Sequence, residues 1–170
     1  MLITPLIETK AELTDGGLEP EPIVLSTRIR LARNLADEAF PGWADVTQRE
    51  GVLDRTLDKL SRLQGLKEGL FFQISDLTDL EKQVLMERRL VSRELIESEE
   101  GSAVYIAPNQ QLAVMVNEED HLRIQSVRSG FNFRSGWDEA DRIDSSIEED
   151  LDYAFSDEYG YLTACPTNVG

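Results

Sequence analysis

The chain has 170 residues, of which 17 are Lys or Arg and 33 are Asp or Glu, so its formal charge is −16. Apolar residues make up 41%, which is typical of one folded domain or of part of one. This acidity argues against a general nucleic-acid binder, because DNA and RNA phosphates would repel the chain. No apolar run approaches the ~20 residues that cross a bilayer, so we expect no membrane partner. A single cysteine allows no internal disulfide, which favours a reducing compartment such as the cytoplasm.

Hydrophobic periodicity and turn residues predict the elements of the first half. They are a flexible lead-in at 1–21, a strand at 23–31, a helix opened by a capping box at 47–50, a strand at 70–74, and a helix opened by a second capping box at 78–81. Leucines at helical spacing support the first helix, and Gly65 and Gly69 end it.

The second half predicts a hairpin, a further strand, a helix and a last strand. They are strands at 103–107, 111–116 and 121–127, a loop at 130–136, an acidic amphipathic helix at 138–155, and a strand at 161–165. Because short links join neighbouring strands, we expect an α+β fold with a largely antiparallel sheet flanked by helices.

Arg28 and Arg30 alternate with apolar residues in the first strand, so their side chains share one face of the sheet. Two guanidinium groups roughly 7 Å apart repel each other unless an anion lies between them. A nucleotide polyphosphate would serve as that anion. An exposed strand face with scattered charge gives the same pattern.

A second cluster follows the acidic turn at 117–120. If this segment is extended, Glu119, His121, Arg123 and Gln125 share one face, which would suit acid–base chemistry and phosphate binding. An ordinary turn with a polar histidine is the alternative. The chain has no glycine-rich phosphate loop and no paired Cys/His metal spacing, so any phosphate binding must use arginine side chains.

Cys165 precedes a proline at the end of the last predicted strand. A thiol there could ionise beside a cation, or it could be a buried structural cysteine.

Three segments together resemble the phosphagen kinase family: residues 26–34 (STRIRLARN), 117–124 (NEEDHLRI) and 161–170 (YLTACPTNVG). The resemblance extends over residues 22–170 and implies the front portion of a guanido kinase catalytic domain, whose fold is glutamine-synthetase-like. It is greatest for the bacterial branch that phosphorylates arginine side chains in proteins, since only some twenty residues precede the first strand.

The resemblance implies roles for seven residues. Ser26, Arg28, Arg30, His121 and Arg123 would bind ATP, whose Mg²⁺ is held mainly through the nucleotide, and no protein metal site is expected. Glu119 would hold and deprotonate the substrate guanidinium, and Cys165 would contact it as a thiolate. The family pattern continues beyond residue 170 with further arginines and a second carboxylate, so we expect an incomplete domain with little activity alone.

The implied substrates are proteins with exposed arginines, and the implied setting is a stress response. The implied partners are a zinc-binding activator protein, a heat-shock repressor and a Clp-type protease. Two alternatives remain: a metabolite phosphagen kinase, and a non-catalytic acidic binding module derived from the kinase.

Overall fold

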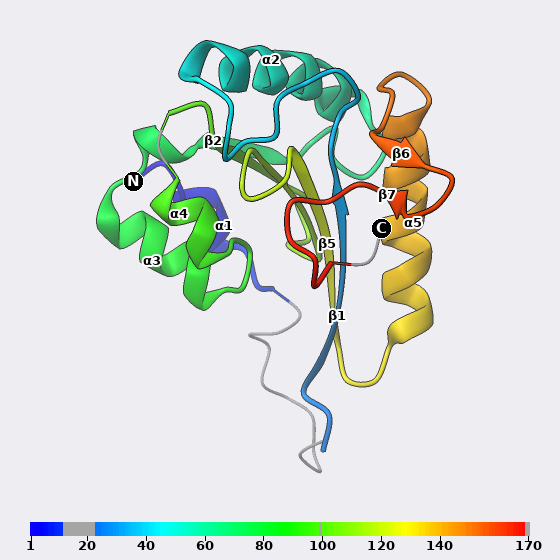
Figure 1. Ribbon diagram of the computed structural model, residues 1–170. Coiled ribbons are helices and arrows are strands. Elements are labelled where there is room, and N and C mark those ends of the chain that lie inside the picture. The colour runs from blue at the N-terminus through cyan, green and yellow to red at the C-terminus, as the bar shows by residue number, and fades with distance from the viewer. Residues whose placement is uncertain (12–22, 99, 169–170) are drawn as a thin grey trace.

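A computed structural model describes residues 1–11, 23–98 and 100–168 of the chain (Figure 1). The five longer strands are β1 Ser26–Arg33, β2 Leu70–Gln73, β3 Ala103–Ile106, β4 Leu112–Val116 and β5 Leu122–Ser129. They form one sheet in the order β1-β5-β4-β3-β2, and every neighbouring pair is antiparallel. The predicted antiparallel α+β fold is therefore confirmed.

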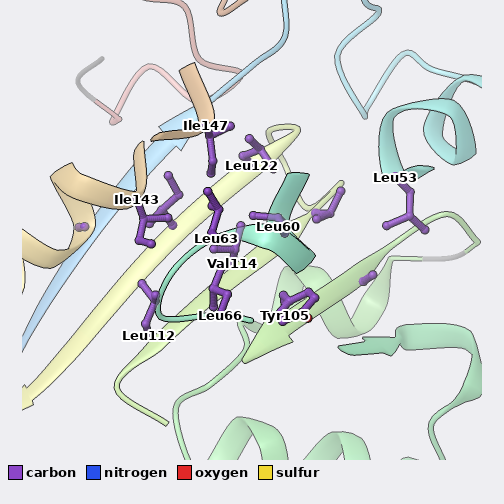
Figure 2. Close-up of a cluster of buried hydrophobic side chains, with 14 of the residues drawn as sticks. Leu53, Leu60, Leu63, Leu66, Tyr105, Leu112, Val114, Leu122, Ile143 and Ile147 are labelled. Atoms are coloured by element: carbon purple, nitrogen blue, oxygen red, sulfur yellow. The ribbon is translucent and has the colours of Figure 1, made fainter. Parts of the chain in front are cut away.

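Helices cover both faces of this sheet. They are α1 Thr4–Glu8, α2 Val46–Arg62, α3 Asp79–Glu87, α4 Arg93–Glu97 and α5 Phe133–Glu148, and a 3-10 turn at Ile74–Asp76 precedes α3. One hydrophobic core lies between the sheet and helices α2 and α5 (Figure 2). A second core lies on the opposite face, under α1, α3 and α4. No helix in the described segments is long and apolar enough to span a membrane.

The lead-in differs from the prediction in its first residues. Helix α1 forms near the N-terminus, and Ile3 and Leu6 are buried in the second core. The Glu81 carboxylate accepts hydrogen bonds from the backbone N–H groups of Leu2 and Ile3. Ile3 and Leu6 therefore pack α1 onto the second core, and the rest of the predicted lead-in, 12–21, lies outside the described residues.

The two capping boxes have different outcomes. Thr78 and Glu81 form the predicted box at the start of α3. The box at 47–50 was wrong, because Asp45 caps α2 instead and exchanges hydrogen bonds of 2.9 Å with Gln48. The Asp45 carboxylate accepts from a helix N-terminus more strongly than a threonine hydroxyl does, so the helix starts two residues earlier.

Helix α5 also differs from its prediction, since it begins at Phe133 rather than 138 and ends at Glu148 rather than 155. Gly136, which suggested a loop, is a helix residue whose added Cβ would lie 3.2 Å from Ile29, so it permits close packing on β1. Beyond the helix, residues 152–154 pair with 34–36 in extended conformation.

The last predicted strand, 161–165, was wrong in extent. A small hairpin of β6 Phe155–Ser156 and β7 Gly160–Tyr161 takes its place. Residues 162–168 then fold back as an irregular turn toward the β4–β5 connection (Figure 1). This return places the cysteine segment near the sheet rather than within it.

Candidate active site

One face of the β1–β5 pair carries the predicted arginines. Arg30 lies opposite Gln125, and Ala32 lies opposite Arg123, so Arg28, Arg30 and Arg123 point to the same side of the sheet. This is the side on which α1, α3 and α4 cover the neighbouring strands. Arg28 and Arg30 are exposed, whereas Arg123 is buried.

Arg89 is a fourth cation at this site, and the sequence analysis did not identify it. It lies in the turn between α3 and α4 with a left-handed backbone (φ 60°). Its Nη1 donates to Ser26 Oγ at 3.0 Å, and its carbonyl accepts from Gln125 Nε2 at 2.7 Å. The Arg89–Ser26 contact spans 63 positions of sequence and the Arg89–Gln125 contact spans 36, so no local sequence pattern predicts them. We call Arg28, Arg30, Arg89 and Arg123 the arginine face.

The electrostatics of the arginine face favour an anion. Burial lowers the pKa of Arg28 first, and the charges of Arg30, Arg89 and Arg123 lower it further. In the described part of the chain, no ion pair joins Arg28 or Arg30 to a carboxylate. Because these cations repel one another, a bound polyanion would be stabilised there.

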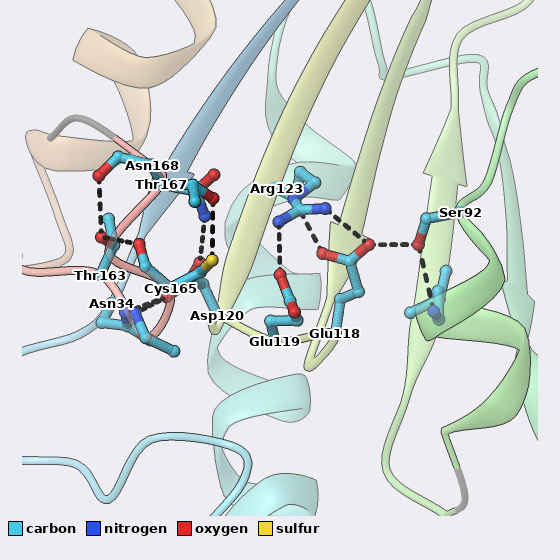
Figure 3. A network of polar contacts seen from close by, with 12 residues as sticks. Asn34, Ser92, Glu118, Glu119, Asp120, Arg123, Thr163, Cys165, Thr167 and Asn168 are labelled. Atoms are coloured by element: carbon cyan, nitrogen blue, oxygen red, sulfur yellow. Dashed lines mark hydrogen bonds and ion pairs between the residues drawn. The ribbon is translucent and has the colours of Figure 1, made fainter.

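Two carboxylates hold Arg123 (Figure 3). Its Nε lies 2.8 Å from Glu118 Oε2, and its Nη1 donates to Glu118 Oε1 at 2.9 Å. Its Nη2 donates to Glu119 Oε2 at 3.1 Å. The Glu118 side chain has no exposed surface and also accepts a hydrogen bond from the Ser92 hydroxyl, whereas 43% of the Glu119 side chain is exposed. Glu119 is thus the accessible carboxylate of the pair.

Glu119 lies at the tip of a turn, not in an extended strand. The N–H of Asn117 donates to the His121 carbonyl, and the N–H of Glu118 donates to the Asp120 carbonyl. Asn117 adopts a left-handed conformation (φ 55°), and its side-chain amide donates to the carbonyls of Arg49 and Gly101. The turn therefore presents Glu119 at the edge of the arginine face.

Asp120 joins this turn to the segment that carries Cys165 (Figure 3). Its buried carboxylate accepts from Asn34 Nδ2 and from the backbone N–H of Ala164, both at 2.6 Å, and from Asn168 Nδ2 at 3.4 Å. The half-buried Cys165 thiol lies 2.9 Å from Thr167 Oγ1. The cysteine segment is thus fixed to the residue that follows Glu119.

His121 faces away from the predicted cluster. Its Nδ1 accepts from the backbone N–H of Leu35 at 3.0 Å, and its Nε2 lies 3.0 Å from the Ala39 carbonyl. The ring is buried and contacts Phe40 edge-on, and burial lowers its pKa. Both ring nitrogens are engaged by backbone, so the structure does not group His121 with the arginines.

The arrangement brings together three chemical functions: a cationic face on which, among the described residues, Arg123 alone is paired with carboxylates, an exposed carboxylate and a thiol. Such a set suits transfer of a phosphoryl group to a nitrogen nucleophile. No group of three or more His, Cys, Asp or Glu side chains within 1–11, 23–98 and 100–168 is placed to hold a metal ion.

Comparison with known proteins agrees with this chemistry. The chain is 42% identical over 171 residues to a protein-arginine kinase from Halothermothrix orenii, covering 100% of this chain and 49% of that protein. It is 41% identical over 150 residues to a protein-arginine kinase from Bacillus subtilis, covering 87% of this chain and 41% of that protein. The chain spans about half the length of the curated relatives it matches.

Solved structures share the fold. The substrate-free duplicated taurocyamine kinase from Schistosoma mansoni superimposes with a TM-score of 0.79 at 23% identity, over 100% of this chain and 25% of that one. A lombricine kinase superimposes with a TM-score of 0.75 at 21% identity, over 95% of this chain and 50% of that one. Residues 51–170 match the ATP:guanido phosphotransferase C-terminal catalytic domain. The chain therefore belongs to the ATP:guanido phosphotransferase family.

Proposed function

We propose that this chain forms part of a protein arginine kinase, which transfers the γ-phosphoryl group of ATP to the guanidinium of arginine side chains in proteins. The observation that carries the proposal is the arginine face, bordered by the accessible carboxylate of Glu119. The identity of 39–42% to proteins named protein-arginine kinase supports it.

The arginine face would bind the polyphosphate. Phosphoryl transfer depends on in-line positioning and on positive charge near the equatorial oxygens. Arg28 and Arg30 are exposed for such contacts, and Arg89 and Arg123 lie beside them. ATP would supply the transferred group, and Mg²⁺ held through its phosphates would add positive charge.

Glu119 and Cys165 would act on the acceptor. An arginine guanidinium has a pKa above ~12 and is a poor nucleophile until a carboxylate orients it and accepts a proton. Glu119 is the exposed carboxylate beside the arginine face. Cys165, fixed by the Asp120 contacts, would provide a second anion as a thiolate. Both ring nitrogens of His121 contact backbone groups of residues 35–39, so we propose that His121 positions this segment and does not bind nucleotide.

A metabolite phosphagen kinase is the second candidate, because the similar folds include taurocyamine and lombricine kinases. One experiment separates the candidates. A chain of the relatives' length is incubated with Mg-ATP and either an arginine-rich protein or free guanidino compounds, and the products are analysed for acid-labile phosphoarginine. We expect label on the protein. Label only on the free compounds supports the metabolite kinase, and no label on either supports a binding module.

We also propose the partners that the family resemblance implies: a zinc-binding activator, a heat-shock repressor and a Clp-type protease in the cytoplasm. The name protein-arginine kinase, which these relatives carry, supports protein substrates. Co-purification of each partner with the wild-type chain and with an Arg28→Ala variant tests the assignment.

A further inference from the structure

We propose that Ser92 is a positioning residue for the arginine face, because its hydroxyl holds the buried carboxylate that in turn holds Arg123. The inference rests on the proposed nucleotide-binding function and adds to it a residue in the turn between α3 and α4. Neither the motifs nor the predicted site residues include Ser92.

The direction of the Ser92 hydrogen bonds follows from its place as the N-cap of α4. Its Oγ accepts from the backbone N–H of Leu95 at 3.1 Å. A hydroxyl has one proton to donate, and the neighbouring acceptor is Glu118 Oε1. Glu118 thus receives a proton donor on the oxygen that also accepts from Arg123 Nη1.

Glu118 needs this support because it is fully enclosed. Burial raises the pKa of its carboxyl, while the Ser92 hydrogen bond, the Arg123 charge and the backbone hydrogen bond of Glu119 lower it, and the charge of the Glu119 carboxylate raises it. Without the Ser92 donor, the neutral acid becomes more favourable, and a neutral acid releases the guanidinium of Arg123.

Ser92 also fixes the turn that carries Arg89. Residues 89 and 92 lie three positions apart, and each end of this short segment is bonded to the site: Arg89 to Ser26 and Gln125, and Ser92 to Glu118. Loss of the Ser92 contact therefore disturbs both Arg123 and Arg89, which are two of the four cations.

Three variants separate hydrogen-bond donation from helix capping. Ser92→Thr retains the cap and the donor. Ser92→Asp retains a good N-cap but replaces the donor with a second carboxylate against Glu118. Thr78→Ala removes a comparable cap, that of α3, whose side chain contacts Glu81 instead of the site.

The experiment is a titration of the 170-residue chain with a fluorescent ATP analogue at several pH values. We expect Ser92→Thr and Thr78→Ala to bind within about threefold of wild type. Ser92→Asp should bind about 10–100-fold more weakly, which corresponds to a lost hydrogen bond to a charged group. Wild-type affinity in Ser92→Asp would overturn the inference.

A second readout does not depend on nucleotide. A ¹³C NMR titration of the Glu118 carboxyl should give a higher midpoint in Ser92→Ala than in wild type, and an unchanged midpoint would reject the contact. If wild type fails to bind ATP, the proposed function is rejected, while the NMR midpoint still decides whether Ser92 controls Glu118.

Discussion

The carboxylate of Asp120 accepts a hydrogen bond of 2.6 Å from the backbone N–H of Ala164, which lies 44 positions away in the sequence. Asp120 follows Glu119, and Ala164 precedes Cys165, so this one contact couples the two predicted catalytic residues. The same carboxylate accepts from the Asn34 amide, which also donates to the Leu162 carbonyl at 3.1 Å. Asp120 and Asn34 are therefore the residues that position the cysteine segment.

Replacing this carboxylate should release the cysteine segment. Asp120→Ala leaves buried donors without acceptors, and we expect the free energy of unfolding to fall by about 3 kcal/mol. Alkylation of Cys165 by iodoacetamide should also become faster under native conditions. The exposed Asp157 provides the control, since Asp157→Ala should change neither quantity. An unchanged alkylation rate in Asp120→Ala would show that Asp120 does not hold the segment.

His121 should make stability depend on pH. Burial lowers the pKa of His121 below the usual 6.5, because desolvation disfavours the charged ring. The unfolded chain then binds the proton more tightly, so this contribution is present above pH 6.5 and is lost as the pH falls through the lowered pKa. The slope can reach about 1.4 kcal/mol per pH unit.

The test compares the free energies of unfolding of wild type and His121→Gln, measured by urea unfolding between pH 8 and pH 5. The stability difference between wild type and variant should be constant at the alkaline end and should shrink toward the acid end. Two parallel curves would mean that His121 does not titrate with folding.

Arg33 and Asp144 form a buried ion pair between β1 and α5. Their nearest atoms, Nη2 and Oδ2, are 2.6 Å apart, and the guanidinium lies 3.8 Å from the ring centre of Tyr161. Burial raises the pKa of Asp144, and the Arg33 charge only partly offsets it. The pair thus anchors the β6–β7 hairpin that leads to the cysteine segment.

Removing one partner of this ion pair should lower the free energy of unfolding more than replacing both partners by apolar residues. Asp144→Ala leaves a buried unpaired guanidinium and should lower the free energy of unfolding by about 3–5 kcal/mol. The double change Arg33→Met and Asp144→Leu should recover at least half of that loss in urea unfolding. Equal losses in the single and double variants would mean that the loss is not due to an unpaired charge.

The strands and the arginine pair could be predicted from the sequence because their signals are local. Alternation along residues 26–31 placed Arg28 and Arg30 on one face, and the antiparallel register confirms it. The Thr78–Glu81 capping box was likewise confirmed, since its partners are three residues apart.

The missed features depend on contacts between distant segments. Arg89 reaches the site only because the fold brings the α3–α4 turn beside β1. Asp120 belongs to an acidic turn in the sequence, and its role depends on a contact with Ala164 that the sequence pattern does not show. The His121 prediction assumed an extended segment, whereas the turn at 117–121 directs the ring to residues 35–39. Gly136 suggested a loop because its packing against Ile29 cannot be read from sequence.

Glu119 and Glu118 should respond differently to the same substitution. Glu119→Gln keeps the shape of an exposed side chain but removes the proton acceptor. In a chain of the relatives' length, we expect kcat to fall by about 10²–10⁴-fold, with stability within about 0.5 kcal/mol of wild type. Glu118→Gln should instead weaken ATP binding and stability, because it loosens Arg123. Equal effects of the two variants on kcat and on binding would contradict these roles.

The most direct test is an ATP titration of the 170-residue chain at low ionic strength, with Arg28→Ala, Arg30→Ala and Arg62→Ala variants. Arg62 is 73% exposed and pairs with Asp58 on α2, so it serves as the matched control. We predict that wild type and Arg62→Ala bind equally, that Arg28→Ala and Arg30→Ala bind about 10–100-fold more weakly, and that added salt weakens wild-type binding. Wild type that does not bind ATP, or all three variants binding as wild type does, would contradict an arginine face built for a polyphosphate.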